Sequence, residues 1–90
     1  MNRGTFGAQM VSGSAVLTVP SGISFNGLYL ATFPSFSARI YLFSVRSEGV
    51  ETVYKSSGLE NLTVTKDGSN NTLTFSYSGL ANQYFEIKKV

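Results

Sequence analysis

The residue types that most often carry out acid–base chemistry are scarce in this chain. Its 90 residues include no histidine and no cysteine, and the five carboxylates are spread along the sequence. Histidine is both the commonest general acid or base and the commonest metal ligand. We therefore expect no cofactor and no metal site. The lack of cysteine also rules out a disulfide scaffold and leaves the redox compartment open.

A serine nucleophile would need lysine or a carboxylate as its base. Lys55 is followed directly by Ser56 and Ser57, which are the residue types of a Ser–Lys arrangement. Neighbouring side chains at the end of a strand point to opposite faces, however. We interpret these three residues as an ordinary turn.

Two carboxylates lie close together in the sequence, at Glu48 and Glu51. Glycosidases use two carboxyl groups roughly 5–10 Å apart in a cleft. Here both residues belong to a polar turn of a thin domain, which favours solvated surface charge. We predict that the chain is not an enzyme.

The longest polar loop runs from Asp67 to Asn71, with the sequence DGSNN. It is similar to the start of a calcium loop, but the bidentate glutamate and the flanking helices of an EF-hand are missing. We predict a hairpin loop. The triplets beginning at Asn61 and Asn70 match the N-glycosylation pattern, which matters only in a protein secreted by a eukaryotic cell.

Aromatic residues are the remaining lead. The chain has seven phenylalanines, five tyrosines and no tryptophan. We expect a core of this size to need fewer rings. Aromatic side chains bind sugars and also anchor protein interfaces, but sugar-binding modules usually favour tryptophan. We predict that the cluster in one hairpin forms core or an interface between copies of the chain. Its members are Tyr29, Phe33, Phe36, Tyr41 and Phe43.

The composition also suits self-association. Charged residues make up 13% of the chain, against a usual share of roughly 25%. A homo-oligomer would bury such a surface, although serine, threonine, asparagine and glycine could solvate it instead. The net charge of +2 comes from scattered basic residues without a stripe, so we expect no nucleic acid as partner. The sequence contains no apolar run of about 18 residues, so we predict no membrane insertion. The first ten residues lack the apolar core of a signal peptide.

Turn signals recur every eight to twelve residues, the spacing typical of a small sandwich or barrel. We predict an all-β, antiparallel β-sandwich of seven or eight strands with jelly-roll or Greek-key connections. Residues 14–90 would form this single domain, and residues 1–13 a lead-in segment or first strand from a larger polypeptide. The expected strands are 6–11, 14–19, 27–33, 36–46, 50–55, 61–66, 72–77 and 83–89.

The segment 27–45 is apolar on both faces. Side chains alternate across a strand, which places Tyr41 and Phe43 on one face and Ile40 and Leu42 on the other. The second face must be covered by another sheet or by a neighbouring chain. The predicted core consists of Val16 or Leu17, Leu28, Leu30, Ile40, Leu42, Val53, Leu62, Val64, Leu73, Phe75, Phe85 and Ile87, which leaves the aromatic face for the interface.

Five stretches carry a family resemblance: SGSAVLTVPSG, GLYLATF, ARIYLFSV, GLENLTVTKDGSNNTLTFSYSG and YFEI. Together they span most of residues 12–87, and they resemble C-terminal domains of bacteriophage tail fibres and related virion appendages. The resemblance implies a trimeric, often jelly-roll-like β-sandwich at the end of a fibre, in contact with a host-surface glycan or protein. It supplies no site motif to transfer to particular residues.

The expected function is therefore a non-enzymatic structural or receptor-binding module of a virion appendage, extracellular and homotrimeric. The alternative is a carbohydrate-binding or adhesin-like module appended to a secreted bacterial protein. Binding contacts should come from loops. The candidates are Asp67, Asn70 and Asn71, with Tyr77 and Tyr84 as stacking rings, the Ser47–Gly49 turn, and Asn82 with Gln83.

Overall fold

The computed structural model describes residues 5–10, 13–34, 37–77 and 83–90. All regular structure among these residues is β-strand, which confirms the predicted all-β class. Each predicted strand overlaps an observed one. The strands are β1 (Thr5–Met10), β2 (Ser14–Thr18), β3 (Gly27–Phe33), β4 (Arg39–Arg46), β5 (Gly49–Lys55), β6 (Thr63–Asp67), β7 (Thr72–Ser76) and β8 (Gln83–Lys89).

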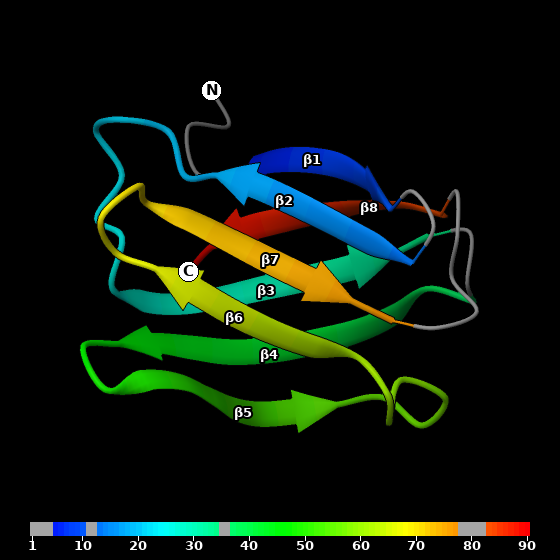
Figure 1. Ribbon diagram of the computed structural model, residues 1–90. Coiled ribbons are helices and arrows are strands. Elements are labelled where there is room, and N and C mark those ends of the chain that lie inside the picture. The colour runs from blue at the N-terminus through cyan, green and yellow to red at the C-terminus, as the bar shows by residue number, and fades with distance from the viewer. Residues whose placement is uncertain (1–4, 11–12, 35–36, 78–82) are drawn as a thin grey trace.

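The strands form two layers (Figure 1). One sheet has five strands in the order β1-β8-β3-β4-β5, and the other has three in the order β2-β7-β6. Every pairing is antiparallel. The chain is thus an antiparallel β-sandwich, as predicted.

The topology follows the Greek-key pattern. β3, β4 and β5 are consecutive neighbours, and β8 returns to lie beside β3. The order β8-β3-β4-β5 has the spatial arrangement of a Greek key, except that β6 and β7 of the other sheet lie between β5 and β8 along the chain. Within the lead-in segment, residues 5–10 form β1 and pair with β8, which corresponds to the first-strand interpretation.

The core lies between the two sheets and is built around aromatic rings. Phe43 of β4 packs edge-on against Phe75 of β7, with ring centroids 5.8 Å apart. Phe85 of β8 contacts Phe75 at 4.9 Å and Phe33 at 5.1 Å. The buried hydrophobic residues are Ala15, Leu17, Val19, Tyr29, Ala31, Phe33, Tyr41, Phe43, Val45, Leu59, Leu62, Leu73, Phe75, Phe85 and Ile87.

The inward face of β3 and β4 is the opposite of the predicted one. Leu28, Leu30, Ile40 and Leu42 lie half-buried on the outer side of the five-stranded sheet. Because both faces of these strands are apolar, alternation alone could not choose between them. The larger rings fill the space of about 10 Å between stacked sheets, and the aliphatic set faces out.

Other core predictions had mixed outcomes. Val53 is 55% exposed and Val16 is 64% exposed, so placing Val53 in the core was wrong and Leu17 is the buried alternative in β2. Val64 is half-buried and packs against the core. The predictions for Leu62, Leu73, Phe75, Phe85 and Ile87 are confirmed.

The predicted aromatic interface is also corrected by this arrangement. Tyr29, Phe33 and Phe43 are 0% exposed and Tyr41 is 2% exposed, because they fill the core of their own chain. They are therefore not a spare surface, and the rings that seemed surplus are the core itself. Phe36, the fifth member of that set, lies outside the described residues.

The buried tyrosines keep their hydroxyl groups at the margin of the core, where partners are present. The Tyr29 hydroxyl donates to the carbonyl of Phe25 at 2.6 Å. The Tyr41 hydroxyl shares a hydrogen bond of 2.9 Å with Thr52 Oγ1. Buried phenols usually find such partners, which lets tyrosine contribute apolar area without an unpaired polar group.

Candidate functional site

Three polar connections gather at one end of the sandwich (Figure 1). They are residues 19–26 between β2 and β3, the β4–β5 turn at 46–49, and the β6–β7 turn at 67–72. We call them together the turn end. The amide of Val19 donates to the carbonyl of Asn71 at 2.8 Å, which ties the first connection to the third. This bond joins two of the three connections beside the three-stranded sheet, while the β4–β5 turn belongs to the five-stranded sheet.

Within the β6–β7 turn, Asp67 organises its neighbours. Its carboxylate accepts hydrogen bonds from the Asn70 side-chain amide at 2.8 Å and from the Ser69 backbone amide at 3.0 Å. These bonds stabilise the charged form and hold the pKa of Asp67 below its usual range. Asp67 and the amide nitrogen of Asn70 are thus engaged in shaping the turn, as turn chemistry predicts.

Asn71 is the most available of the predicted loop residues. Its φ angle is +54°, a left-handed conformation that asparagine adopts more readily than most residues. Its side chain is exposed, and no partner for its amide group occurs among the residues that the structure describes. The amide can therefore offer both a donor and an acceptor to a ligand.

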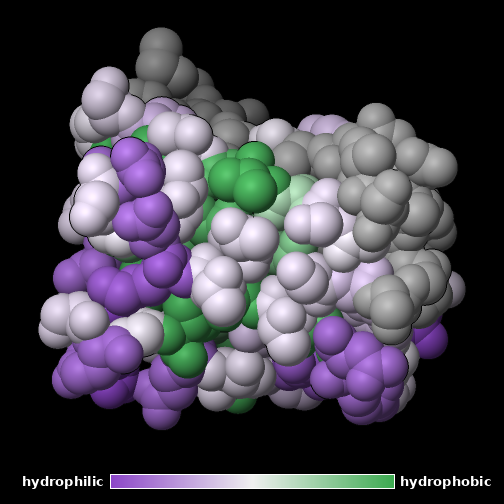
Figure 2. Space-filling model, viewed as in Figure 1, coloured by the Kyte–Doolittle hydropathy of each residue, from purple (hydrophilic) through white to green (hydrophobic). Residues whose placement is uncertain are grey.

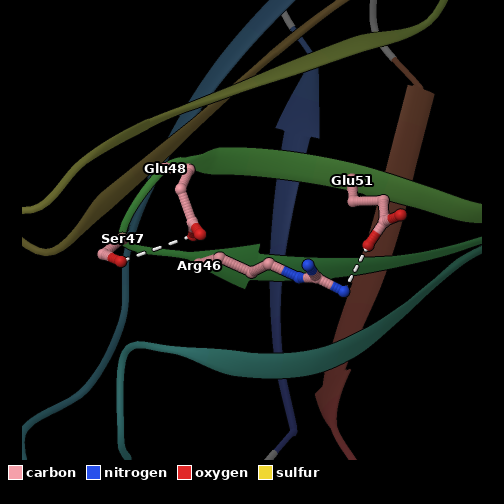
Figure 3. A network of polar contacts seen from close by, with 4 residues as sticks. All are labelled: Arg46, Ser47, Glu48 and Glu51. Carbon is pink, nitrogen blue, oxygen red and sulfur yellow. Dashed lines mark hydrogen bonds and ion pairs between the residues drawn. The ribbon is translucent and has the colours of Figure 1, made fainter.

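The β4–β5 turn carries a separate polar network (Figure 3). Arg46 Nη2 lies 2.5 Å from Glu51 Oε1, and Ser47 Oγ donates to Glu48 Oε1 at 3.4 Å. A shallow depression of about 320 Å³ is lined by Arg46, Glu48, Gly49, Val50 and Glu51.

The two glutamates of this network point toward different partners, Glu48 to Ser47 and Glu51 to Arg46. The side chains of Arg46 and Glu51 are 59% and 56% exposed. An ion pair at this exposure contributes about 0.2–1 kcal/mol to stability. The geometry is that of surface charge, and it leaves a guanidinium and two carboxylates accessible to a polar ligand.

The structure does not bring the predicted rings to the β6–β7 turn. Tyr77 follows β7 at the opposite end of the sandwich, where its hydroxyl donates to the carbonyl of Gly58. Tyr84 lies on β8, 46% exposed, with its hydroxyl 3.4 Å from Glu86 Oε2. Asn82 lies outside the described residues. Gln83 is the first residue of β8.

The Ser–Lys residues have structural partners. Lys55 Nζ donates to the carbonyl of Leu62 at 2.7 Å and lies 5.0 Å from the centre of the Tyr41 ring. Ser56 Oγ accepts a hydrogen bond from the amide of Ile40 at 3.0 Å. These contacts fasten the β5–β6 connection to the sheet, which fits the interpretation of residues 55–57 as a turn.

Other kinds of site find no support in the described part of the chain. No group of three or more acidic, histidine or cysteine side chains that could hold a metal ion occurs within residues 5–10, 13–34, 37–77 and 83–90. The same residues contain no helix long and apolar enough to cross a membrane.

Sequence reasoning missed one feature, the half-buried aliphatic surface on the outer side of the five-stranded sheet. The two-sided apolar pattern of residues 27–45 could have revealed this surface. The prediction placed the aliphatic side of that segment in the core and the aromatic side outside, the reverse of the structure. Comparison of the chain with protein-family models, with curated proteins and with solved structures found no match.

Proposed function

We propose that this chain is a non-enzymatic structural and receptor-binding module of a phage tail fibre or similar virion appendage. It acts outside the cell as part of the virion, as a homo-oligomer and most simply as a trimer. The turn end recognises a hydroxyl-rich glycan on the host surface. The family resemblance supports the assignment to a virion appendage, and the polar side chains of the turn end support binding to a glycan.

The observation that carries the proposal is the gathering of polar side chains at the turn end. The amide of Asn71 and the carboxylate of Glu48 belong to turns at the same end of the sandwich (Figure 1). Such groups donate to and accept from sugar hydroxyls. Loops on a rigid scaffold are the usual location of binding residues, and the Val19–Asn71 hydrogen bond holds two of these connections in place.

Binding of labelled protein to a panel of bacterial cells and to an array of bacterial surface glycans tests this proposal. The diagnostic variant combines Asn70→Ala with Asn71→Gly, which removes both amides while glycine retains the left-handed backbone. Asp67 stays in place to cap the turn. The matched control is Ser57→Ala, an exposed turn residue at the opposite end of the sandwich.

The double variant should lower the affinity for cells or glycans at least tenfold, with the control unchanged and both proteins folded by circular dichroism. Equal binding by wild type and the double variant would exclude the β6–β7 turn as the recognition element. A wild-type protein that bound no cell and no glycan would count against the receptor-binding function.

The alternative function, a carbohydrate-binding module appended to a secreted bacterial protein, is favoured by one observation. Tyr54 and Tyr84 are 54% and 46% exposed, and exposed rings can stack on sugars. Light scattering separates the two functions, because appended sugar modules are usually monomeric. The virion proposal requires a particle of at least two chains, each of 9.7 kDa.

A further inference from the structure

The outer side of the five-stranded sheet carries an apolar surface that no described strand covers. The eight strands of the described residues all belong to the two layers of the sandwich, so none of them forms a third layer over this side. We call its hydrophobic residues the outer apolar face: Leu28, Leu30, Ile40, Leu42, Tyr54 and Tyr84.

The strand register makes this face continuous. Leu30 of β3 lies directly opposite Leu42 of β4, and Leu42 lies opposite Tyr54 of β5. Directly opposed side chains in an antiparallel pair have Cβ atoms about 4.5–5.5 Å apart. An unbroken apolar row therefore crosses three strands, and Lys88 of β8 flanks it beside Leu30.

The other outer side of the sandwich has a different character. Its equivalent row across β2, β7 and β6 is Val16, Thr74 and Thr65. Figure 2 views this sheet from outside and shows pale, weakly polar side chains over its centre, with hydrophobic areas between and beside them and hydrophilic side chains at the left and the bottom. Threonine hydroxyl groups lie beside Val16 in that row. Thr32 and Ser44 lie on the outer side of the five-stranded sheet as well, but its central row of Leu30, Leu42 and Tyr54 contains neither serine nor threonine.

Charge favours a second copy as the occupant. Glu86 and Lys88 lie on β8 at one side of the apolar row, and the Arg46–Glu51 pair lies on β4 and β5 at the other. Each side carries one acid and one base, so a second copy of the chain can place opposite charges against both sides.

One of the two edges of the five-stranded sheet, β5, discourages the competing mode of contact, strand addition. Leu42 pairs with Tyr54 and Phe43 pairs with Thr52, so Val53 is an extra residue that forms a bulge in the edge strand β5. Bulges interrupt the ladder and twist an edge away from further pairing. Contact through the face avoids this obstacle.

We propose that a second copy of this chain packs on the outer apolar face. This inference rests on the homo-oligomeric part of the proposed function, and it places the interface on the aliphatic set in place of the aromatic one. Leu30 and Leu42 lie at its centre, and Glu86, Lys88, Arg46 and Glu51 lie at its rim.

Sedimentation velocity across the micromolar range tests this interface with the full chain. The face variant combines Leu42→Thr with Tyr54→Ser, which keeps strand-compatible side chains and removes apolar area. The matched control is Val16→Ser, which removes an exposed apolar residue from the other sheet. Circular dichroism verifies that both are folded.

We expect an assembled wild type and control, and a face variant that sediments as a 9.7 kDa monomer. A monomeric wild type at every concentration would overturn both this interface and the homo-oligomer of the proposed function. An assembled wild type whose mass the face variant leaves unchanged would overturn this interface alone.

Thiol protection gives a second measurement that does not depend on the folding of the face variant. The chain has no cysteine, so Tyr54→Cys and Val16→Cys each introduce a unique thiol. Maleimide labelling of the residue-54 thiol should slow at least tenfold from dilute to concentrated protein, while the residue-16 thiol keeps its rate. Equal rates at both positions and both concentrations would contradict the proposal.

Discussion

Tyr29 of β3 and Phe43 of β4 lie directly opposite each other and stack with ring centroids 5.5 Å apart and planes 9° from parallel. Phe43 also meets the edge of Phe75 from the other sheet at 5.8 Å. These contacts join the two layers of the sandwich. The aromatic side of the β3–β4 hairpin is therefore the inner side, and this leaves its aliphatic side for contacts beyond the chain.

Phe43→Ala should destabilise the fold strongly. The side chain is fully buried, and truncating a buried phenylalanine costs about 3–5 kcal/mol through lost transfer energy and the cavity left behind. Leu42→Ala, on the neighbouring outward position, should cost less than half as much in dilute protein. Urea unfolding measures both. Equal losses would mean that the two faces are not distinguished as described.

Tyr29 should make stability fall at high pH. Burial raises the pKa of Tyr29 from 10.0 to about 12. The folded chain therefore holds this proton more tightly than the unfolded chain does. The resulting stabilisation is complete below pH 10 and declines as the pH rises toward about 12. Urea midpoints over this range should fall more steeply for wild type than for Tyr29→Phe, and parallel profiles would be inconsistent with a protonated, buried phenol.

At neutral pH the same Tyr29→Phe variant should be modestly less stable than wild type. It loses the hydrogen bonds of the hydroxyl to the carbonyls of Phe25 at 2.6 Å and Ser24 at 3.3 Å, and a typical hydrogen bond contributes about 0.5–1.5 kcal/mol. The ring itself remains, so packing against Phe43 is retained. Urea unfolding at pH 7 measures the difference, and a loss above about 3 kcal/mol would indicate that the hydroxyl holds more than these two contacts.

The strand positions and part of the core could be predicted because the sequence marks them locally. In 72–76 and 83–89 polar residues alternate with Leu73, Phe75, Phe85 and Ile87, so the inward face is explicit, and these four residues are buried. In β3 and β4 no polar set marks the outside. The choice there depends on how ring volume fills the space between the sheets, which is a property of the assembled sandwich.

The candidate site shows a similar division. The Asp67–Asn71 turn and its internal hydrogen bonds follow from residue type. Grouping Tyr77 with it was avoidable, because the five residues of β7 at about 3.3 Å each place Tyr77 at the far end of the sandwich. The position of Tyr84 on the outer side of the other sheet depends on the pairing of β8 with β1 and β3, which one sequence does not specify.

Asn71 provides a test of the turn itself. At φ +54°, Asn71→Gly should unfold within about 0.5 kcal/mol of wild type, since glycine tolerates left-handed geometry. Asn71→Val should lose about 1–2 kcal/mol, because a β-branched side chain is poorly tolerated in left-handed geometry and lacks the polar group with which asparagine hydrogen-bonds locally. Thermal unfolding of both proteins decides the matter, and a valine variant as stable as wild type would refute the left-handed assignment.

Ser44→Ala should keep or raise stability. Ser44 Oγ is shielded from solvent and has no hydrogen-bond partner within the described portion of the chain. An unsatisfied buried hydroxyl carries a desolvation penalty of about 1–3 kcal/mol, part of which the alanine variant recovers. Calorimetric melting provides the comparison, and a clear loss of stability would show that the hydroxyl has a partner after all.

One binding measurement tests both recognition by the turn end and assembly through the outer apolar face. The apparent affinity for a recognised bacterial cell is compared between wild type and the Leu42→Thr, Tyr54→Ser variant. Linking several sites raises avidity by about 10²–10⁴ without new contacts. The variant should still bind the same cells, with an apparent Kd weaker by a factor in that range. Equal apparent affinities for an assembled wild type and a monomeric variant would contradict it.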